Sequence, residues 1–60
     1  MAIYRVDFYD HGDNIRVSHD LHQCDDETPI VVAHTLNVLP HMSAGFAVWE
    51  GDRLVYRHVN

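Results

Sequence analysis

The segment from His19 to Asp26 brings several possible metal ligands into one short stretch of this 60-residue chain. If the stretch is extended, Asp20, His22 and Cys24 share one face, and zinc binds carboxylate oxygen, imidazole nitrogen and cysteine sulfur. The spacing matches no established zinc signature, and the six histidines are spread over the whole chain. We therefore expect no metal cofactor. A metal-binding or metal-sensing domain that uses Asp20, His22 and Cys24 is the alternative.

Residues that could act as nucleophiles have little support around them. Cys24 precedes an expected helix start, where a thiolate is favoured, but the carboxylates that follow it oppose that charge. Ser18 and Ser43 lie close to histidines without the glycine-flanked turn that presents a catalytic serine. The three glycines are isolated, so no glycine-rich loop can hold a phosphate group. We expect a protein that is not an enzyme and has no cofactor.

The balance of charge argues against a nucleic-acid ligand. Nine acidic residues outnumber four arginines, lysine is absent, and the formal net charge is −5. Binding to a phosphate backbone needs clustered basic residues, and these arginines are scattered. An acidic inhibitor that docks on a basic protein is an alternative, provided that six carboxylates gather on one side. They are Asp7, Asp10, Asp13, Asp20, Asp25 and Asp26.

The sequence shows neither a membrane span nor a secretion signal. No stretch approaches the ~20 apolar residues that cross a bilayer. The N-terminus lacks a basic start followed by a long apolar segment. The single cysteine, Cys24, excludes an internal disulfide framework and suits a reducing compartment. We expect a cytoplasmic protein that does not bind a membrane.

Two segments near the N-terminus predict a β-hairpin. Apolar and polar residues alternate in Ile3–Tyr9 and again in Ile15–Leu21, as in strands with one buried face. The linking segment Asp10–Asn14 is polar and contains Gly12, as a short hairpin loop requires. The apolar sides are expected to carry Tyr4, Val6 and Phe8 on the first strand and Ile15, Val17 and Leu21 on the second.

A helix is expected to begin at about Asp26 or Pro29 and to end at about Val38 or Leu39. Thr28 and Pro29 form a good N-cap and first-position pair, and Asp25 or Asp26 could cap one turn earlier. Pro40 disfavours helical backbone at the residue before it. The buried stripe is expected to hold Ile30, Ala33 and Leu36, with Val32 and Leu39 as further candidates. Val31 and Val38 fall outside that stripe, which indicates a second covered surface.

Phe46–Trp49 and Leu54–Val59 predict a second hairpin around Gly51 and Asp52. A two-residue turn with glycine first favours type II′. The expected cross-strand pairs are Glu50–Arg53, Trp49–Leu54, Val48–Val55 and Ala47–Tyr56. One face of this hairpin would then carry Ala47, Trp49, Leu54 and Tyr56, and the other Phe46, Val48 and Val55. A sheet with a single helix does not need two apolar faces, so we expect another chain to cover one of them.

Three segments together resemble a group of short uncharacterised proteins common in alphaproteobacteria. They are Tyr4–Asp10, His19–Leu21 with Cys24–Glu27, and Val48–Val55. The pattern of the group is a strand, an Asp-Gly turn and a second strand, followed by a Cys-Asp-Asp-Glu helix start and a Trp-x-Gly-Asp-Arg hairpin. The chain departs from it at Thr28–Pro29 and in a longer connection from Pro40 to Gly45. The resemblance implies a bacterial cytoplasmic protein with two hairpins and one helix, and it implies no activity.

These patterns predict one α+β domain over residues 1–60, with ββαββ order and one helix on one face of a four-stranded antiparallel sheet. The strand order stays open, because the helix can return the chain to either edge of the first hairpin. In a chain this small, the free energy gained from apolar burial is about equal to the entropy cost of folding, which favours association. We expect a small non-catalytic protein-interaction module that forms a homodimer or binds another protein. The candidate interface residues are Val31, Val38, Trp49, Leu54 and Tyr56.

Overall fold

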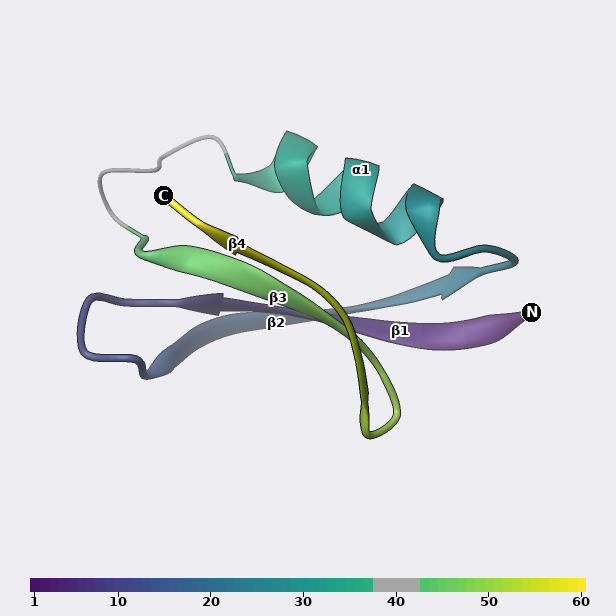
Figure 1. The fold of residues 1–60 in the computed structure, drawn as a ribbon, viewed down its shortest axis with the longest axis horizontal. Helices are drawn as coiled ribbons and strands as arrows, with labels where there is room; N and C mark the ends of the chain where they lie inside the picture. The colour runs from purple at the N-terminus through teal and green to yellow at the C-terminus, as the bar shows by residue number, and fades with distance from the viewer. Residues whose placement is uncertain (38–42) are drawn as a thin grey trace.

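The sheet and its single helix define the architecture. A computed structural model describes residues 1–37 and 43–60 of the chain. Its elements are β1 (Ala2–Tyr9), β2 (Ile15–Gln23), α1 (Glu27–Leu36), β3 (Gly45–Glu50) and β4 (Arg53–Val59). The strands form one antiparallel sheet in the order β2-β1-β3-β4, and α1 lies on one side of it (Figure 1). The predicted α+β class and ββαββ order are confirmed.

The strand order follows from where α1 returns the chain. Both β2 and β3 pair antiparallel with β1, so they run parallel to each other on its two sides. α1 connects β2 to β3 across β1, and β4 then pairs with the outer side of β3. The second hairpin therefore joins the free edge of β1 and leaves β2 and β4 as the two edge strands.

The core lies between the sheet and α1. Val6, Val48 and Phe46 have no exposed surface, and they stand opposite one another or side by side on the two central strands. Ala33 of α1 is also fully buried against this cluster. Tyr4 and Phe8 extend the cluster along β1, as the alternation in the sequence predicts.

The first hairpin differs from expectation where its loop meets β2. Within the loop, Asp13 adopts the left-handed backbone conformation, with φ of 61°. The Asp10 carboxylate accepts the backbone N–H groups of Gly12 and Asn14 at 2.8 and 3.0 Å, and these bonds lower its pKa. A bulge at the start of β2 pairs Ile15 with Tyr9. Ile15 therefore does not share the face of Val17, contrary to the prediction.

The helix is capped by a carboxylate from the residues before it. The Asp25 carboxylate accepts the Thr28 backbone N–H at 2.6 Å, which lowers the pKa of Asp25 and satisfies a free donor of the first turn. Thr28 is therefore not the cap. The described helix ends at Leu36, whose side chain is 42% exposed rather than part of a buried stripe. The expected end at Val38 or Leu39 lies outside the described residues.

The second hairpin has the predicted turn but a different register. Gly51 takes φ of 59°, as the first position of a type II′ turn requires. The Glu50–Arg53 and Trp49–Leu54 pairs are confirmed. A bulge beyond them leaves Val55 without a partner, so Val48 pairs with Tyr56 and Ala47 with Arg57. The predicted Val48–Val55 and Ala47–Tyr56 pairs are wrong, because one extra residue in β4 reverses the face of everything after it.

Candidate interaction surface

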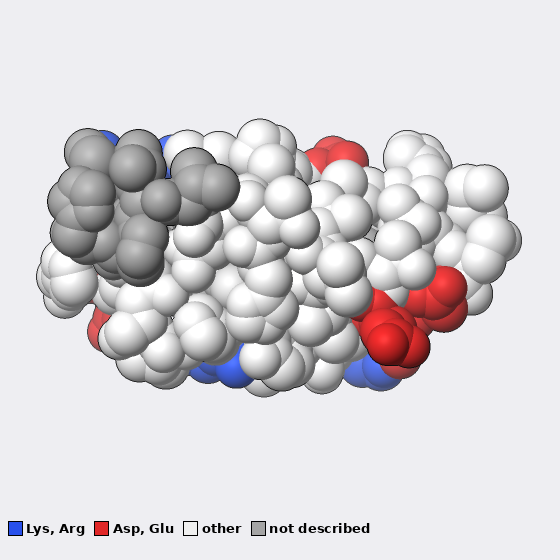
Figure 2. All heavy atoms as spheres, turned by 90° about the horizontal axis from the view of Figure 1, so that it is seen from above, with Lys and Arg blue, Asp and Glu red and all other residues white. Residues whose placement is uncertain are grey.

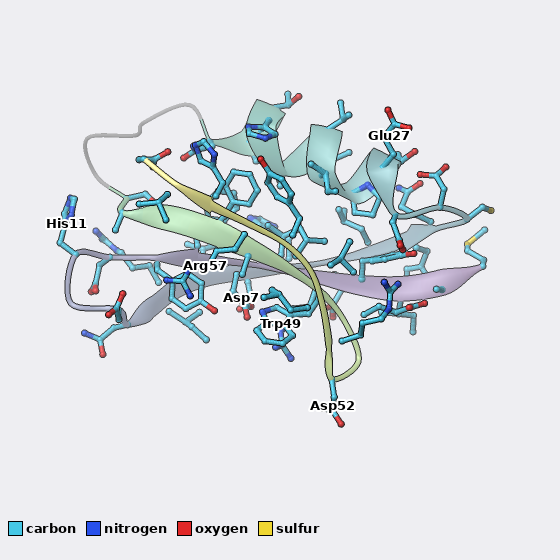
Figure 3. All side chains as sticks on the ribbon, viewed as in Figure 1. Asp7, His11, Glu27, Trp49, Asp52 and Arg57 are labelled. Atoms are coloured by element: carbon cyan, nitrogen blue, oxygen red, sulfur yellow. The ribbon has the colours of Figure 1, made fainter. Side chains whose placement is uncertain are left out.

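The sheet face away from α1, here called the open face, is covered by no element of the described residues (Figure 1). Its members follow from the strand registers, and Asp7 and Trp49 are seen to point to this side in Figure 3. The open face carries Ile3, Arg5, Asp7 and Tyr9 of β1, Ile15, Ser18, Asp20 and His22 of β2, Ala47 and Trp49 of β3, and Leu54, Arg57 and Val59 of β4.

A buried carboxylate lies at the centre of the open face. Asp7 is only 1% exposed although no helix covers it. Its carboxylate accepts the Arg5 Nε–H at 3.1 Å and the Ser18 hydroxyl at 2.7 Å. A buried charge is tolerated only when it is paired and hydrogen-bonded. Asp7 therefore holds the Arg5 and Ser18 side chains in place. The charge of its carboxylate is balanced by that of Arg5.

Two arginines lie over two aromatic rings around this centre. The Arg5 guanidinium carbon is 5.9 Å from the centre of the Trp49 ring, and that of Arg57 is 5.5 Å from the Tyr9 ring. Both distances are in the range of cation–π attraction. The Trp49 Nε1–H is buried without a hydrogen-bond partner among the described residues. Trp, Tyr and Arg are the residue types most enriched at the energetic centres of protein interfaces.

Exposed apolar side chains surround these residues. Leu54 lies beside Trp49 in the register and is 48% exposed, and Ile3 on β1 is 59% exposed. Ile15 and Val59, near the other end of the strands, are exposed to a similar or greater degree. Polar and apolar groups are therefore mixed on this face, as in interfaces that form between separately folded chains.

Tyr56 and Val31, two of the predicted interface residues, lie on the other side of the sheet. Tyr56 is half-buried, and its hydroxyl is 3.3 Å from the His34 Nε2 atom of α1. It packs with Phe46, so its predicted place beside Trp49 is wrong, because the bulge in β4 turns it to the α1 side. Val31 on α1 is 56% exposed. Val38 lies outside the described residues.

An aromatic group on the α1 side was not foreseen from the sequence. The His34 ring meets the Phe46 ring edge-on at 5.0 Å and the His58 ring at 4.9 Å between centroids. Phe46 and His58 also stack, at 5.2 Å. The contact between Phe46 and His58 follows from their pairing in the sheet. That pairing depends on the bulge at Val55, which the sequence does not indicate.

A second network joins the start of α1 to the β3–β4 hairpin. Asp26 accepts the Tyr4 hydroxyl at 2.5 Å and two Arg53 N–H groups at 2.9 and 3.2 Å, while Arg53 also donates to Glu50. The Arg53 and Tyr4 bonds lower the pKa of Asp26, and the bond to Asp26 raises the pKa of Tyr4 to about 12. The same carboxylates raise the pKa of Arg53. Of these contacts, only the Glu50–Arg53 pair could be predicted from the sequence. Asp26 is distant in sequence from both Tyr4 and Arg53.

The candidate metal ligands are not gathered into a site. Asp20 and His22 lie on β2, whereas Cys24 is exposed beyond its end. Within residues 1–37 and 43–60, no group of three or more His, Cys, Asp and Glu side chains could hold a metal ion. The described part of the chain also has no helix of the length and apolar character needed to cross a membrane.

The hydroxyls considered as nucleophiles already have structural partners. The Ser18 hydroxyl donates to the Asp7 carboxylate. The Ser43 hydroxyl lies 3.1 Å from the carbonyl oxygens of Tyr9 and Gly45. These two hydroxyls hold a buried carboxylate and the start of β3 in place.

The carboxylates needed by an acidic inhibitor are dispersed. Asp10 and Asp13 lie in the β1–β2 loop, and Asp25 and Asp26 lie at the start of α1, at the other end of the sheet (Figure 1). Figure 2 shows acidic side chains beside the start of α1 and mostly uncharged atoms over the rest of the α1 side. Asp7 is buried, so the six carboxylates do not form one acidic surface.

No family model matches the chain, and comparisons with curated proteins and with solved structures give no match. The resemblance to short alphaproteobacterial proteins therefore stays a prediction.

Proposed function

We propose that the chain is a small non-catalytic protein-interaction module of the cytoplasm that self-associates through its open face. The observation that carries the proposal is the pairing of Trp49 and Tyr9 with Arg5 and Arg57 on a sheet face that no described element covers. These side chains offer large contact areas at low cost in conformational entropy, because their rings are already held by the arginines.

The charges at the two edges of the open face favour a second copy of the chain as the occupant. Asp20 lies on edge strand β2, and Arg57 lies on edge strand β4. If two copies stack with their strands aligned and with β4 of one over β2 of the other, each Arg57 lies over the second copy's Ser18, two pairs along the ladder from Asp20. The same stacking sets Arg5 against Trp49, because β1 then faces β3. Contacts between an arginine and an aromatic ring, with an opposite charge nearby, favour this orientation of the two copies.

The size of the chain supports association as well. A domain of 60 residues buries a smaller share of its surface than a larger domain does, and its folding stability is correspondingly small. A partner that binds only the folded state adds to that stability by mass action. A homodimer supplies such a partner without any second protein.

Sedimentation equilibrium with two matched substitutions tests the proposal. Leu54→Ser removes a half-exposed apolar side chain from the open face, and Val31→Ser removes a similarly exposed one from α1. We expect the wild type to dimerise, Leu54→Ser to weaken the dimer by about tenfold or more, and Val31→Ser to leave it unchanged. A wild-type protein that is strictly monomeric at high micromolar concentration contradicts the proposal, as does an equal effect of both substitutions.

A further inference from the structure

Strand β2 is the most exposed element of the sheet. Every residue from Ile15 to Asp20 is exposed, including Val17 at 47%, although Val17 shares the side on which α1 lies. β2 pairs only with β1, so among the described strands its outer edge has no partner. A long unpaired edge presents free backbone N–H and C=O groups to any strand that fits beside it.

The other edge strand, β4, is protected in ways that β2 is not. The bulge at Val55 interrupts the ladder of β4 early, and its Tyr56 is bonded to His34 of α1. Asn60, the residue after β4, accepts a hydrogen bond from the Asn37 side chain and donates one to the Ser43 carbonyl. β2 also has a bulge, between Ile15 and Val17, but its register with β1 is regular over the seven residues from Val17 to Gln23. Natural edge strands are commonly interrupted or covered along their length, so the long regular stretch of β2 indicates a partner.

We propose that β2 pairs antiparallel with β2 of a second copy, with His19 on the two-fold axis. This contact goes beyond the proposed function, because it forms through the backbone edge of β2 and not through the surface of the open face. β2 has nine residues, and His19 is the fifth of them. Centring the pair there places the regular stretch Val17–Leu21 opposite the same stretch of the second copy, beyond the bulge between Ile15 and Val17.

The side chains of β2 suit this register. Val17 stands opposite the second copy's Leu21, and both lie on the α1 side, so an apolar residue meets an apolar residue across the new ladder. Asp20 stands opposite the small Ser18. A register centred on Asp20 would instead place two carboxylates directly opposite each other, which is destabilising.

The two-fold axis of this contact is normal to the sheet. It doubles the four-stranded sheet into one continuous sheet, with both open faces on the same side. The face-to-face contact of the proposed function has its axis in the plane of the sheet. The two contacts use different parts of the sheet, so each can be tested by itself.

Disulfide trapping tests the edge contact residue by residue. In a Cys24→Ser background, which removes the exposed native thiol, His19→Cys places two thiols across the axis. Directly opposite residues of antiparallel strands have Cα atoms about 4.5–5.5 Å apart, within the range that a disulfide spans. His22→Cys on the same exposed strand is the matched control, since its two copies would be about 20 Å apart.

We expect oxidised His19→Cys to form a covalent dimer on a non-reducing gel, and His22→Cys to stay at the background level. An equimolar mixture of Val17→Cys and Leu21→Cys should cross-link, and each alone should do so far less; this arm keeps His19 and its contact with Phe8 intact. Equal cross-linking of His19→Cys and His22→Cys overturns the proposal, and so does no cross-linking of His19→Cys together with none in the mixture. The proposed function stands in either case if the untrapped protein still dimerises and Leu54→Ser weakens that dimer.

Discussion

The two faces of the sheet carry different kinds of side chain. The face under α1 is apolar and closed, with Val6, Phe46 and Val48 fully buried. The open face holds a buried carboxylate, arginines stacked on aromatic rings, and exposed apolar residues around them. Burial of apolar surface under α1 supplies the folding free energy, and polar pairing organises the open face. The same alternating strands can therefore build a core on one side and a presented surface on the other.

The largest expected effect separates the two faces by stability. Phe46→Ala removes a fully buried ring under α1, and a change of this kind costs about 3–5 kcal/mol. We expect the variant to be largely unfolded, because that cost is comparable to the whole stability of a small domain. Leu54→Ala on the open face is the control and, at a concentration where the wild type is monomeric, should unfold at close to the wild-type temperature. Thermal unfolding followed by circular dichroism measures both, and a folded Phe46→Ala variant would contradict this division between the faces.

An intermediate effect is expected within the open face itself. Arg5→Met keeps much of the side-chain length but leaves the buried Asp7 carboxylate with Ser18 as its remaining partner. Loss of a partner from a buried polar group costs about 1–3 kcal/mol. Arg57→Met also removes a guanidinium from an aromatic ring but touches no carboxylate among the described contacts, so it should cost less. Urea unfolding of both variants measures the difference, and equal losses would show that the Arg5–Asp7 pair is not what organises this face.

The smallest expected effect concerns the network that joins α1 to the β3–β4 hairpin. The pKa of Asp26 is lowered in the folded state by Arg53 and Tyr4, so its contribution to stability is present at neutral pH and is lost as the pH falls through the lowered pKa. Asp26→Asn should therefore be less stable than the wild type at neutral pH, with a gap that narrows in acid. Asp52→Asn, at the exposed hairpin turn, controls for the change in net charge. A gap between wild type and Asp26→Asn that is the same at all pH values would exclude an electrostatic origin.

The sequence predicts the elements of this fold well because their signals are local. Alternation marks β1, the residues around Pro29 mark the start of α1, and Gly51 marks the second turn. The bulge at Val55 has no such signal, since it depends on how β4 packs against β3 and α1. That one residue moves Tyr56 from the predicted interface to the α1 side.

The candidate surface is only partly accessible from sequence for the same reason. Trp49 and Leu54 can be placed together, because they adjoin a turn of known geometry. The burial of Asp7 and the arginine–ring contacts involve side chains on different strands, and they depend on the register between β1 and its two neighbours. An acidic residue on an alternating strand is ordinarily solvent-exposed, so nothing in the sequence marks Asp7 as the centre of a surface.

Trp49 is the single tryptophan of the chain and lies on the open face, so its fluorescence reports directly on whether that face becomes covered. Emission spectra of the untagged wild-type protein, recorded over a dilution series and matched to sedimentation, test whether two copies meet through this face. We expect the Trp49 emission maximum to move to shorter wavelength as the dimer forms, and Leu54→Ser to move this transition to higher concentration. An emission maximum that does not change while the measured mass doubles would contradict self-association through the open face, because the copies would then meet elsewhere.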